Sequence, residues 1–398
     1  MTDSRDATGK TFISYIAEVS IAERNNIVII GGGLAGLTSA IHLCRAGLQV
    51  TLIEKHTYPG HKVCGEYISN EVLPYLRWLG ADPAVLEPAQ LSRVAVSVAG
   101  GRTITSPLPL GGFGVSRYTL DHFLMQHAAA AGCRILQDTV TDIRFSGNEF
   151  AITTARHGML QAEMTIGAYG KRAALDTRLQ RGFLQQRSPW LAVKGHYEGD
   201  FPEQLVALHN FSGGYCGVSR IENKKVNICY LVSYDSFRRS KNLQAHREEV
   251  LYRNPHLRRI FENCRPLFPQ PMTISQIAFG PKQPVDAHVL MTGDTAGMIH
   301  PLCGNGMAMA IDSARIAAEL LTAYFKEHKY NRQQLETAYT AAWNKAFKSR
   351  MQMGSLLNGL FLKEKLSAAT MRALTVFPAL LPAIIRRTHG KAANTYMS

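Results

Sequence analysis

The sequence predicts an α/β protein, in which a Rossmann-like dinucleotide-binding domain is interleaved with an antiparallel β-sheet domain and followed by C-terminal helices. Three observations predict this fold class: glycine-rich strand-to-helix junctions after residues 27–30 and after residues 288–292, and a strand-rich stretch between them. With 398 residues, 46% of them hydrophobic, the chain is long enough for two domains with ordinary globular cores.

The first junction contains the parts of a nucleotide-binding βαβ unit in the expected order. Residues 27–30 form an unbroken apolar run, which is typical of a buried parallel strand. Three glycines follow at G-x-G-x-x-G spacing, namely Gly31, Gly33 and Gly36. They permit a tight turn, a close approach of a pyrophosphate and close packing of a helix, expected here over residues 34–46. Glu54 ends the next strand, 18 residues beyond Gly36, and can accept hydrogen bonds from a ribose.

The second junction has the same strand–turn–helix order. Its strand, residues 288–292, ends in Gly293-Asp294, and a loop of mostly small residues leads into a helix expected over residues 308–321. The aspartate can bind a ribose hydroxyl, and free N–H groups at a helix start can bind an anion or a ring carbonyl. Either junction alone is compatible with a structural turn, but together they indicate one large dinucleotide held at both ends.

Polar side chains in two other segments are candidates for chemistry. Residues 57–69 are expected to loop past the reactive end of the dinucleotide, and they contain Cys64 and Glu66. The alternative is a buried cysteine beside a turn glycine, with the glutamate capping a helix. Arg117 stands at the start of an alanine-rich helix, where it can meet a phosphate or a ring system. Its alternative is a salt bridge to Asp121, one helical turn further on.

The composition limits which cellular compartment and which bound metals are expected. Seven scattered cysteines without a C-x-x-C pair argue for a reducing compartment and against a disulfide framework or a zinc site, so no metal is expected. The polar N-terminus does not resemble a secretory signal, and residues 1–24 carry no motif. No apolar run reaches the ~20 residues that a spanning helix needs. We therefore expect a cytoplasmic protein.

The C-terminal region is basic. From Lys345 onward there are nine Lys or Arg residues and one acid, which accounts for +8 of the net charge of +14. Aromatic residues are sparse there and no nucleic-acid module is visible, so nucleic acid is not an expected partner. The uncharged run at residues 373–385 is bounded by Arg372 and Arg386 and contains two prolines. It can lie in an anionic membrane interface, placing the protein at the inner face of the membrane, or pack as a helical pair over the substrate domain.

These motifs resemble those of the FAD-dependent oxidoreductases that share the para-hydroxybenzoate hydroxylase fold, especially the geranylgeranyl reductase-related branch. The resemblance covers roughly residues 25–325. Residues 62–66 resemble the C-G motif beside the isoalloxazine, and Gly293-Asp294 resembles the G-D motif at the flavin-side ribose and pyrophosphate. Residues 301–307 match the loop and helix start under the flavin ring. The resemblance implies FAD as cofactor and a Rossmann-like FAD-binding domain of the GR2 type.

The site residues that follow from the motifs and the resemblance form three groups. The expected cofactor contacts are Gly31, Gly33, Leu34, Ala35, Gly36, Glu54, Lys55, Lys62, Cys64, Arg117, Val140, Gly293, Asp294, Gly304, Asn305, Gly306 and Met307. The candidate catalytic residues are Cys64 and Glu66, and the candidates for the substrate pocket are Tyr215 and Pro301. The expected FAD-binding segments are 25–90, 112–184 and 284–330, the substrate-domain segments are 91–111 and 185–283, and a helical region covers 331–398.

Departures from the family pattern bear on the reaction. Tyr169-Gly170 stands where the hydroxylases often have Asp-Gly, a motif linked to FAD and NAD(P)H binding. The Y-x-W-x-F-P signature of geranylgeranyl reductases is reduced to residues 215–220, and the W-x-W-x-I-P stretch of flavin halogenases is absent, which argues against halogenation. No second G-x-G-x-x-G follows a strand, so NAD(P)H is expected to dock transiently or a partner protein to deliver electrons.

An apolar substrate, lipidic or aromatic, is expected from the apolar C-terminal region. The leading hypothesis is a flavin monooxygenase that hydroxylates a phenolic or polyketide-type compound in lipid or secondary metabolism. The first alternative is a geranylgeranyl reductase-like enzyme that saturates C=C bonds of a prenyl or polyene lipid. The second is a non-catalytic flavin-fold lipid carrier.

Overall fold

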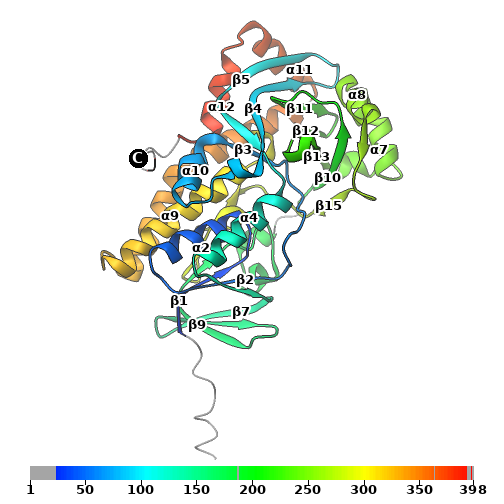
Figure 1. Ribbon diagram of the computed structural model, residues 1–398. Coiled ribbons are helices and arrows are strands. Elements are labelled where there is room, and N and C mark those ends of the chain that lie inside the picture. Colours follow the sequence, from blue (N-terminus) through cyan, green and yellow to red (C-terminus); the bar gives the residue numbers. More distant parts are fainter. Residues whose placement is uncertain (1–23, 186–187, 363, 392–395, 397–398) are drawn as a thin grey trace, which may run out of the picture.

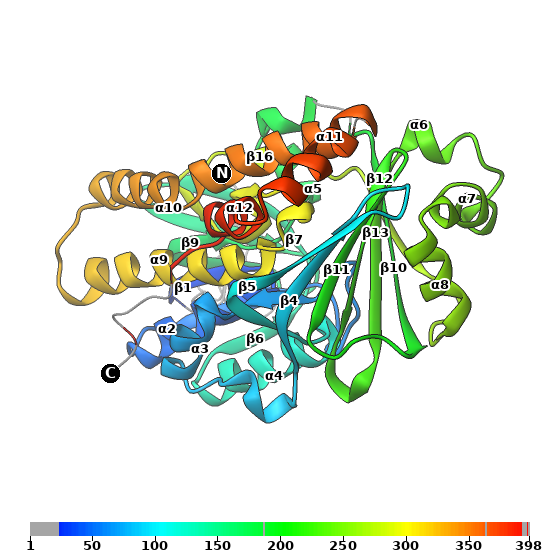
Figure 2. The same ribbon diagram turned by 90° about the horizontal axis from the view of Figure 1, so that it is seen from above.

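The computed structural model describes residues 24–185, 188–362, 364–391 and 396 of the chain. Residues 1–23, for which the sequence offered no motif, lie outside the described residues. The described chain contains two large sheets, which are connected by several crossings of the chain and flanked by long helices (Figures 1 and 2). The predicted α/β class, with a Rossmann-type domain, a second sheet and C-terminal helices, is confirmed.

The first sheet is built around a buried parallel core. In spatial order its strands are β17 (Val285–Asp286), β18 (Val289–Met291), β9 (Met159–Gly167), β1 (Arg24–Ile30), β2 (Val50–Glu54) and β6 (Arg134–Gln137). The hairpin β7 (Val140–Ser146) and β8 (Glu149–Thr154) joins through β9. The pairs around β1 are parallel, and Ile27, Val28 and Ile29 have no exposed surface. The apolar run therefore forms the fully buried central strand that its composition predicts.

Helices cover the parallel strands. The main ones are α2 (Leu34–Arg45), α4 (Arg117–Ala130), α9 (Gly306–Lys326) and α10 (Arg332–Leu362), and the short α3 (Leu73–Trp78) and α5 (Ala174–Arg178) lie in connections. The helix α2 packs against both α4 and α9, and α10 lies along α9 (Figure 1). The two helices that follow the glycine-rich junctions, α2 and α9, are thus neighbours, although they begin more than 250 residues apart in the sequence.

The second sheet forms the wall opposite these helices. Its spatial order is β14 (Cys264–Pro266), β10 (Trp190–Gly199), β13 (Val226–Ser233), β12 (Gly214–Arg220), β11 (Leu205–Phe211), β4 (Ala89–Ser97), β5 (Thr103–Gly114) and β3 (Tyr67–Ser69), with β15 (Met272–Ser275) also on β10. Its outer side carries α6 (Tyr234–Phe237), α7 (Leu243–Glu249) and α8 (Pro255–Asn263), and a small ribbon joins β16 (Gly280–Pro281) to β19 (Gly297–Met298). The sheet is antiparallel as predicted, except that β4 and β11 pair in parallel because they come from separate passes of the chain.

The C-terminal region folds back over the second sheet as two helices. The helices α11 (Glu364–Val376) and α12 (Leu380–Thr388) pack on β5, and the segments 369–376 and 380–388 are bent by 112° relative to each other (Figure 2). The break falls at Phe377–Ala379, where Pro378 has no N–H to continue a helix. Among the described residues, no single helix is long and apolar enough to cross a membrane, and only this bent pair meets that test jointly.

A buried carboxylate ties this region to the rest of the molecule. Glu71, in the short helical turn after β3, accepts hydrogen bonds from Arg350 Nη1 on α10 (3.2 Å) and from the Gly390 N–H just after α12 (2.5 Å). The Asn305 side chain, ahead of α9, donates to the same carboxylate at 3.4 Å. Glu71 therefore connects the end of α12 to α10 and to the loop before α9 by polar contacts.

Candidate flavin and substrate site

The glycine-rich junctions meet at the carboxyl ends of parallel strands, where α/β folds bind ligands. At the β1–α2 turn, a Cβ atom on Gly36 would lie 1.9 Å from the Gly31 carbonyl oxygen. Gly31 itself has φ +106°, which side-chain-bearing residues rarely adopt. At Gly33, in contrast, the nearest atom to an added Cβ would be Arg117 Nη2 at 3.5 Å, and Gly33 faces a cavity. Gly31 and Gly36 thus build the turn, whereas Gly33 leaves the space that a pyrophosphate would occupy.

Glu54 is fixed close to this turn. Its Oε2 accepts from the Gly32 N–H at 2.6 Å and its Oε1 from the His56 N–H at 3.0 Å. Tyr58, which the sequence analysis did not single out, donates its hydroxyl to the Gly32 carbonyl at 2.5 Å. An acidic side chain with two oxygens retains acceptor capacity beyond these bonds, so its place agrees with a ribose contact.

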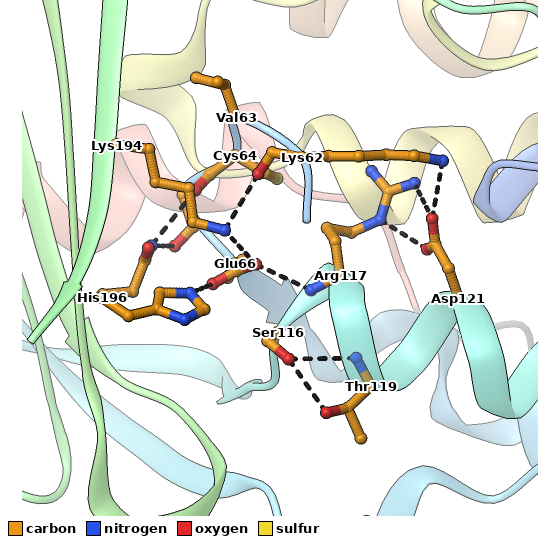
Figure 3. Close-up of polar contacts among 12 residues, drawn as sticks. Lys62, Val63, Cys64, Glu66, Ser116, Arg117, Thr119, Asp121, Lys194 and His196 are labelled. Atoms are coloured by element: carbon orange, nitrogen blue, oxygen red, sulfur yellow. Dashed lines mark hydrogen bonds and ion pairs between the residues drawn. The ribbon is translucent and has the colours of Figure 1, made fainter. Parts of the chain in front are cut away.

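Arg117 forms the predicted contact to Asp121 and also lines the cavity. Its Nε and Nη2 donate to the two Asp121 oxygens at 2.6 and 2.8 Å, and Lys62 Nζ donates to the same carboxylate at 2.9 Å (Figure 3). Burial raises the pKa of Asp121, but the two cations outweigh it and the net pKa is lowered. Two cations on one carboxylate leave a net positive charge beside Gly33, as an anionic cofactor requires.

Glu66 belongs to a buried charge cluster whose other members the sequence analysis missed. Its Oε1 accepts from Lys194 Nζ (2.5 Å) and from the Arg117 N–H (2.8 Å), and its Oε2 contacts His196 Nε2 at 2.7 Å (Figure 3). Burial acts to raise the Glu66 pKa, but the hydrogen bond to His196 and the charge of Lys194 lower it overall. Lys194 and His196 come from β10, so this cluster joins the flavin-side loop to the second sheet.

The loop with Cys64 is held from the same sheet. The Asn227 side-chain amide, on β13, donates to the carbonyls of Cys64 at 3.2 Å and Gly65 at 2.8 Å. Cys64 is half-buried and lines the cavity. The structure therefore positions Cys64 firmly, and its catalytic role, like that of Glu66, stays a prediction.

The second junction is held by side chains outside the motif. The Gly293 N–H donates to Ser313 Oγ on α9 at 2.8 Å, and Lys282 Nζ donates to the carbonyls of Asp294 (2.9 Å) and Lys171 (2.7 Å). Burial lowers the pKa of Lys282 to about 8. The Asp294 carboxylate takes no part in these bonds and lines the cavity, where it can meet a ribose hydroxyl.

A cavity of about 330 Å³ connects the two junctions to the C-terminal helices. Apolar side chains dominate the part away from the glycines. They come from the second sheet and from α10, α11 and α12: Val94, Val96, Leu108, Val206, Leu208, Leu357, Leu360, Leu374, Leu381, Ile384 and Ile385. One continuous space thus runs from the predicted cofactor segments to an apolar chamber under the bent helical pair.

The predicted site residues fall into two sets. Those that line the cavity are Gly33, Leu34, Ala35, Cys64, Glu66, Arg117, Tyr215, Gly293, Asp294, Pro301, Gly304, Gly306 and Met307. Those that do not are Gly31, Gly36, Glu54, Lys55, Lys62, Val140 and Asn305. Gly31 and Gly36 act inside the turn, Lys62 is engaged with Asp121, Lys55 points to solvent and Val140 is buried at the start of β7. The cofactor contacts of this second set stay predictions.

The curated relatives of this chain include a halogenase and a lipid reductase. The chain is 23% identical over 321 residues to a tryptophan 2-halogenase of Chondromyces crocatus, covering 75% of this chain and 61% of that protein. It is 22% identical over 369 residues to a digeranylgeranylglycerophospholipid reductase of Methanosarcina mazei, covering 85% of each chain. Halogenases therefore return as a candidate class, although their W-x-W-x-I-P stretch is absent here.

The fold and the family agree. The structure resembles the flavin-dependent brominase Bmp2 with a TM-score of 0.76 at 18% sequence identity, covering 92% of this chain and 93% of that one. Residues 24–346 match the family described as the FAD binding domain, and this range includes both glycine-rich junctions and the whole second sheet. The glycine cradle, the net positive charge beside it and the chamber at its end fit that cofactor. The chain belongs to this family and is an FAD-dependent oxidoreductase of the para-hydroxybenzoate hydroxylase-fold superfamily.

Proposed function

We propose that this protein hydroxylates an apolar phenolic compound with a long alkyl or prenyl chain. The observation that carries the proposal is the continuous cavity, which joins the glycine cradle to a chamber lined mostly by apolar side chains. The volume of about 330 Å³ covers both the cradle assigned to the cofactor and the apolar chamber. A substrate ring would lie near Gly304, with its chain directed toward α11 and α12.

Named residues of this chain would hold and shield the reactants. Gly33 and Arg117 would hold the cofactor phosphates, Asp294 a ribose hydroxyl, and the N–H groups at the start of α9 the carbonyl edge of the flavin. Bound, reduced FAD would supply two electrons and two protons for the cleavage of O₂: one oxygen atom enters a ring C–H bond as a hydroxyl group, and the other leaves as water. The apolar chamber would exclude bulk water from the reacting ring.

The electrons for this reaction must come from outside the described site. A transiently docked NAD(P)H or a donor protein would supply them, in keeping with the lack of a second dinucleotide motif. Tyr169 stands at the position of the missing aspartate and donates weakly to Met291 Sδ at 3.6 Å.

Reduction of prenyl C=C bonds is the second candidate. It is favoured by the relation to the lipid reductase of Methanosarcina mazei, which covers 85% of both chains. The same chamber would hold a prenyl chain, and Cys64 would lie beside the flavin. In this reaction no oxygen is consumed and the product gains two hydrogen atoms.

The surface around the chamber supports peripheral attachment to a membrane. The tip of the bent pair exposes Val376 and Phe377, while Leu374 and Leu381 on the same two helices line the cavity. Arg372 on α11 and Arg386 on α12 are both exposed and bound the uncharged run in the sequence. A lipid substrate would then pass between the helices from the inner face of an anionic membrane into the chamber.

An anaerobic reduction experiment distinguishes the candidates. The FAD-loaded protein is reduced without oxygen, and para-heptylphenol or geranylgeraniol is added before O₂ is admitted. Hydroxylation predicts that the flavin stays reduced until O₂ enters, followed by a phenolic product that is heavier by one oxygen atom. Reoxidation of the flavin by geranylgeraniol before O₂ enters would establish the reductase instead. A protein that remains colourless after reconstitution with FAD would be a lipid carrier.

A further inference from the structure

Two polar atoms on aromatic residues that line the cavity are buried and have no hydrogen-bond partner among the described residues. They are the hydroxyl oxygen of Tyr67 on β3 and Nε2 of His389 just after α12. Both atoms are fully buried, both residues line the cavity, and the Tyr67 side chain is 8% exposed. Their ring centroids are 6.2 Å apart in an edge-to-face arrangement. Because a buried polar group without a partner is costly, such a pair in a cavity indicates a ligand group.

The hydrogen-bonding roles of the two atoms follow from their surroundings. His389 Nδ1 lies 2.9 Å from the Ile385 carbonyl oxygen, which can only accept, and 3.1 Å from the Thr388 hydroxyl. Since that hydroxyl donates its own hydrogen to the Ile385 carbonyl at 2.9 Å, we assign the hydrogen of the neutral ring to Nδ1. Burial lowers the pKa of His389 and raises that of Tyr67, so both side chains are neutral near pH 7. Tyr67 therefore offers an O–H donor to the cavity, and His389 Nε2 offers a lone pair.

The pair lies between the two ends of the site. A Cβ atom on Gly304, in the loop expected under the flavin ring, would be 3.2 Å from Tyr67 Cδ1. His389 follows α12, whose Ile384 and Ile385 line the apolar chamber. A group bound by the pair would sit beside the expected reaction centre, with apolar surface beyond it.

We infer that Tyr67 and His389 form a subsite for a hydroxyl group on the reacting end of the substrate. A hydroxyl oxygen can accept from the Tyr67 O–H while its own hydrogen is donated to His389 Nε2, so that both buried atoms are satisfied at once. A ketone would satisfy only Tyr67, and a methyl ether would leave His389 unpaired and add a methyl group. The inference depends on the proposed function in one respect, namely that the hydroxyl group at this subsite belongs to an aromatic ring. The substrate would then be a free phenol, and Tyr67 and His389 would be positioning residues.

Binding to the oxidised, FAD-loaded protein tests this inference without any turnover. Para-heptylphenol and its methyl ether, para-heptylanisole, share the apolar body and differ only in the hydroxyl hydrogen. Calorimetric titration is expected to show the phenol binding roughly threefold to tenfold more tightly than the ether. In His389→Ala the two dissociation constants should become equal, chiefly through weaker binding of the phenol. Tyr67→Phe should weaken the binding of both compounds and keep the preference, because the phenol can still donate to His389 Nε2.

The two variants include their own control for folding. Tyr67→Phe removes an oxygen atom that has no partner among the described residues, so its melting temperature should not fall. Any of four results would overturn the subsite: a lower melting temperature for Tyr67→Phe, equal affinities in the wild type, an unchanged preference in His389→Ala, or a lack of binding by both compounds. A preserved preference without hydroxylation under O₂ would uphold the subsite and reject only the proposed reaction.

Discussion

Two glycines of the first junction lack a side chain for different reasons. At Gly36 a side chain would collide with the protein backbone, whereas at Gly33 it would enter the space proposed for the cofactor. Gly33→Val places a side chain in the cavity without a close protein contact, since the nearest atom to its Cβ is 3.5 Å away. We expect it to fold normally and to lose bound flavin, measured by absorbance after purification and by circular dichroism. Gly36→Val is the matched comparison. Its Cβ would lie 1.9 Å from the Gly31 oxygen, so it should cost more than about 3 kcal/mol of folding stability. Full flavin retention in Gly33→Val would refute the assignment of the cradle.

The Glu66 cluster carries a second prediction at this scale. Glu66→Gln leaves Lys194 buried without a countercharge, which typically costs about 3–5 kcal/mol. The folded-state pKa of Glu66 is below its ordinary value of 4.5. Its charge therefore stabilises the fold above that pH, and the contribution is lost as the pH falls through the folded-state pKa.

Urea unfolding at two pH values measures this contribution. The stability gap between wild type and Glu66→Gln should be full at about pH 7 and smaller at about pH 3.5. Asp121 also has a lowered pKa, but it is present in both proteins and cancels in the difference. A gap of equal size at both pH values would show that the carboxylate charge is not what stabilises the cluster.

The sequence predicted the site residues that belong to local motifs, but not those that reach the site from distant strands. Glu54, Arg117 and the glycines belong to a contiguous motif or to a helix start, and the structure places them together at the cradle. His196 and Lys194 contact Glu66 across 130 and 128 positions of the sequence. Their strand has no motif that points to this partner, so only the fold could reveal the cluster.

Secondary-structure elements were predicted better than the pairing between them. The helix after the first junction was expected over residues 34–46 and is observed at Leu34–Arg45. The apolar run at residues 373–385 was expected to be interrupted by its prolines, and it divides into α11 and α12 around Pro378. The parallel pairing of β4 with β11 was not foreseeable, because strand neighbours from separate passes of the chain leave no periodic signal.

The bent pair of helices α11 and α12 is predicted to bind anionic membranes. Its tip exposes Val376 by 68% and Phe377 by 62%, and the same two helices carry exposed arginines that favour anionic lipid. The protein should therefore sediment with vesicles that contain phosphatidylglycerol, and less so as salt is added. Replacing both residues by Asp should weaken this binding at least about tenfold, since two apolar side chains no longer enter the interface.

A variant elsewhere on the surface controls for a general effect of added charge. Val85, 70% exposed in the turn before β4, offers a similar apolar group outside the bent pair, and Val85→Asp should bind vesicles almost like the wild type. The idea fails if the tip variant sediments normally, or if neutral phosphatidylcholine vesicles bind as well as anionic ones.

At the scale of the whole molecule, the site depends on segments that are distant in sequence. The cradle follows β1, the cluster at Glu66 recruits β10, the Gly-Asp turn follows β18, and the C-terminal helices close the chamber. The first sheet contributes the cofactor segments and the second sheet the chamber wall. Because the chain passes between them repeatedly, a ligand that bridges these segments should stabilise the folded molecule as one unit.

This interleaving gives the last prediction. FAD that binds only the folded state should raise the unfolding free energy by about 2.7 kcal/mol at a hundredfold excess over its dissociation constant. The melting temperature of the apoprotein should thus increase with the logarithm of FAD concentration, and both sheets should unfold in a single transition. The Gly33→Val protein should melt like the apoprotein at every FAD concentration, because its fold is intact and its cradle is filled. A second transition that FAD does not shift would mean that the second sheet folds independently of the cofactor segments, and the chamber would then not be coupled to the cradle.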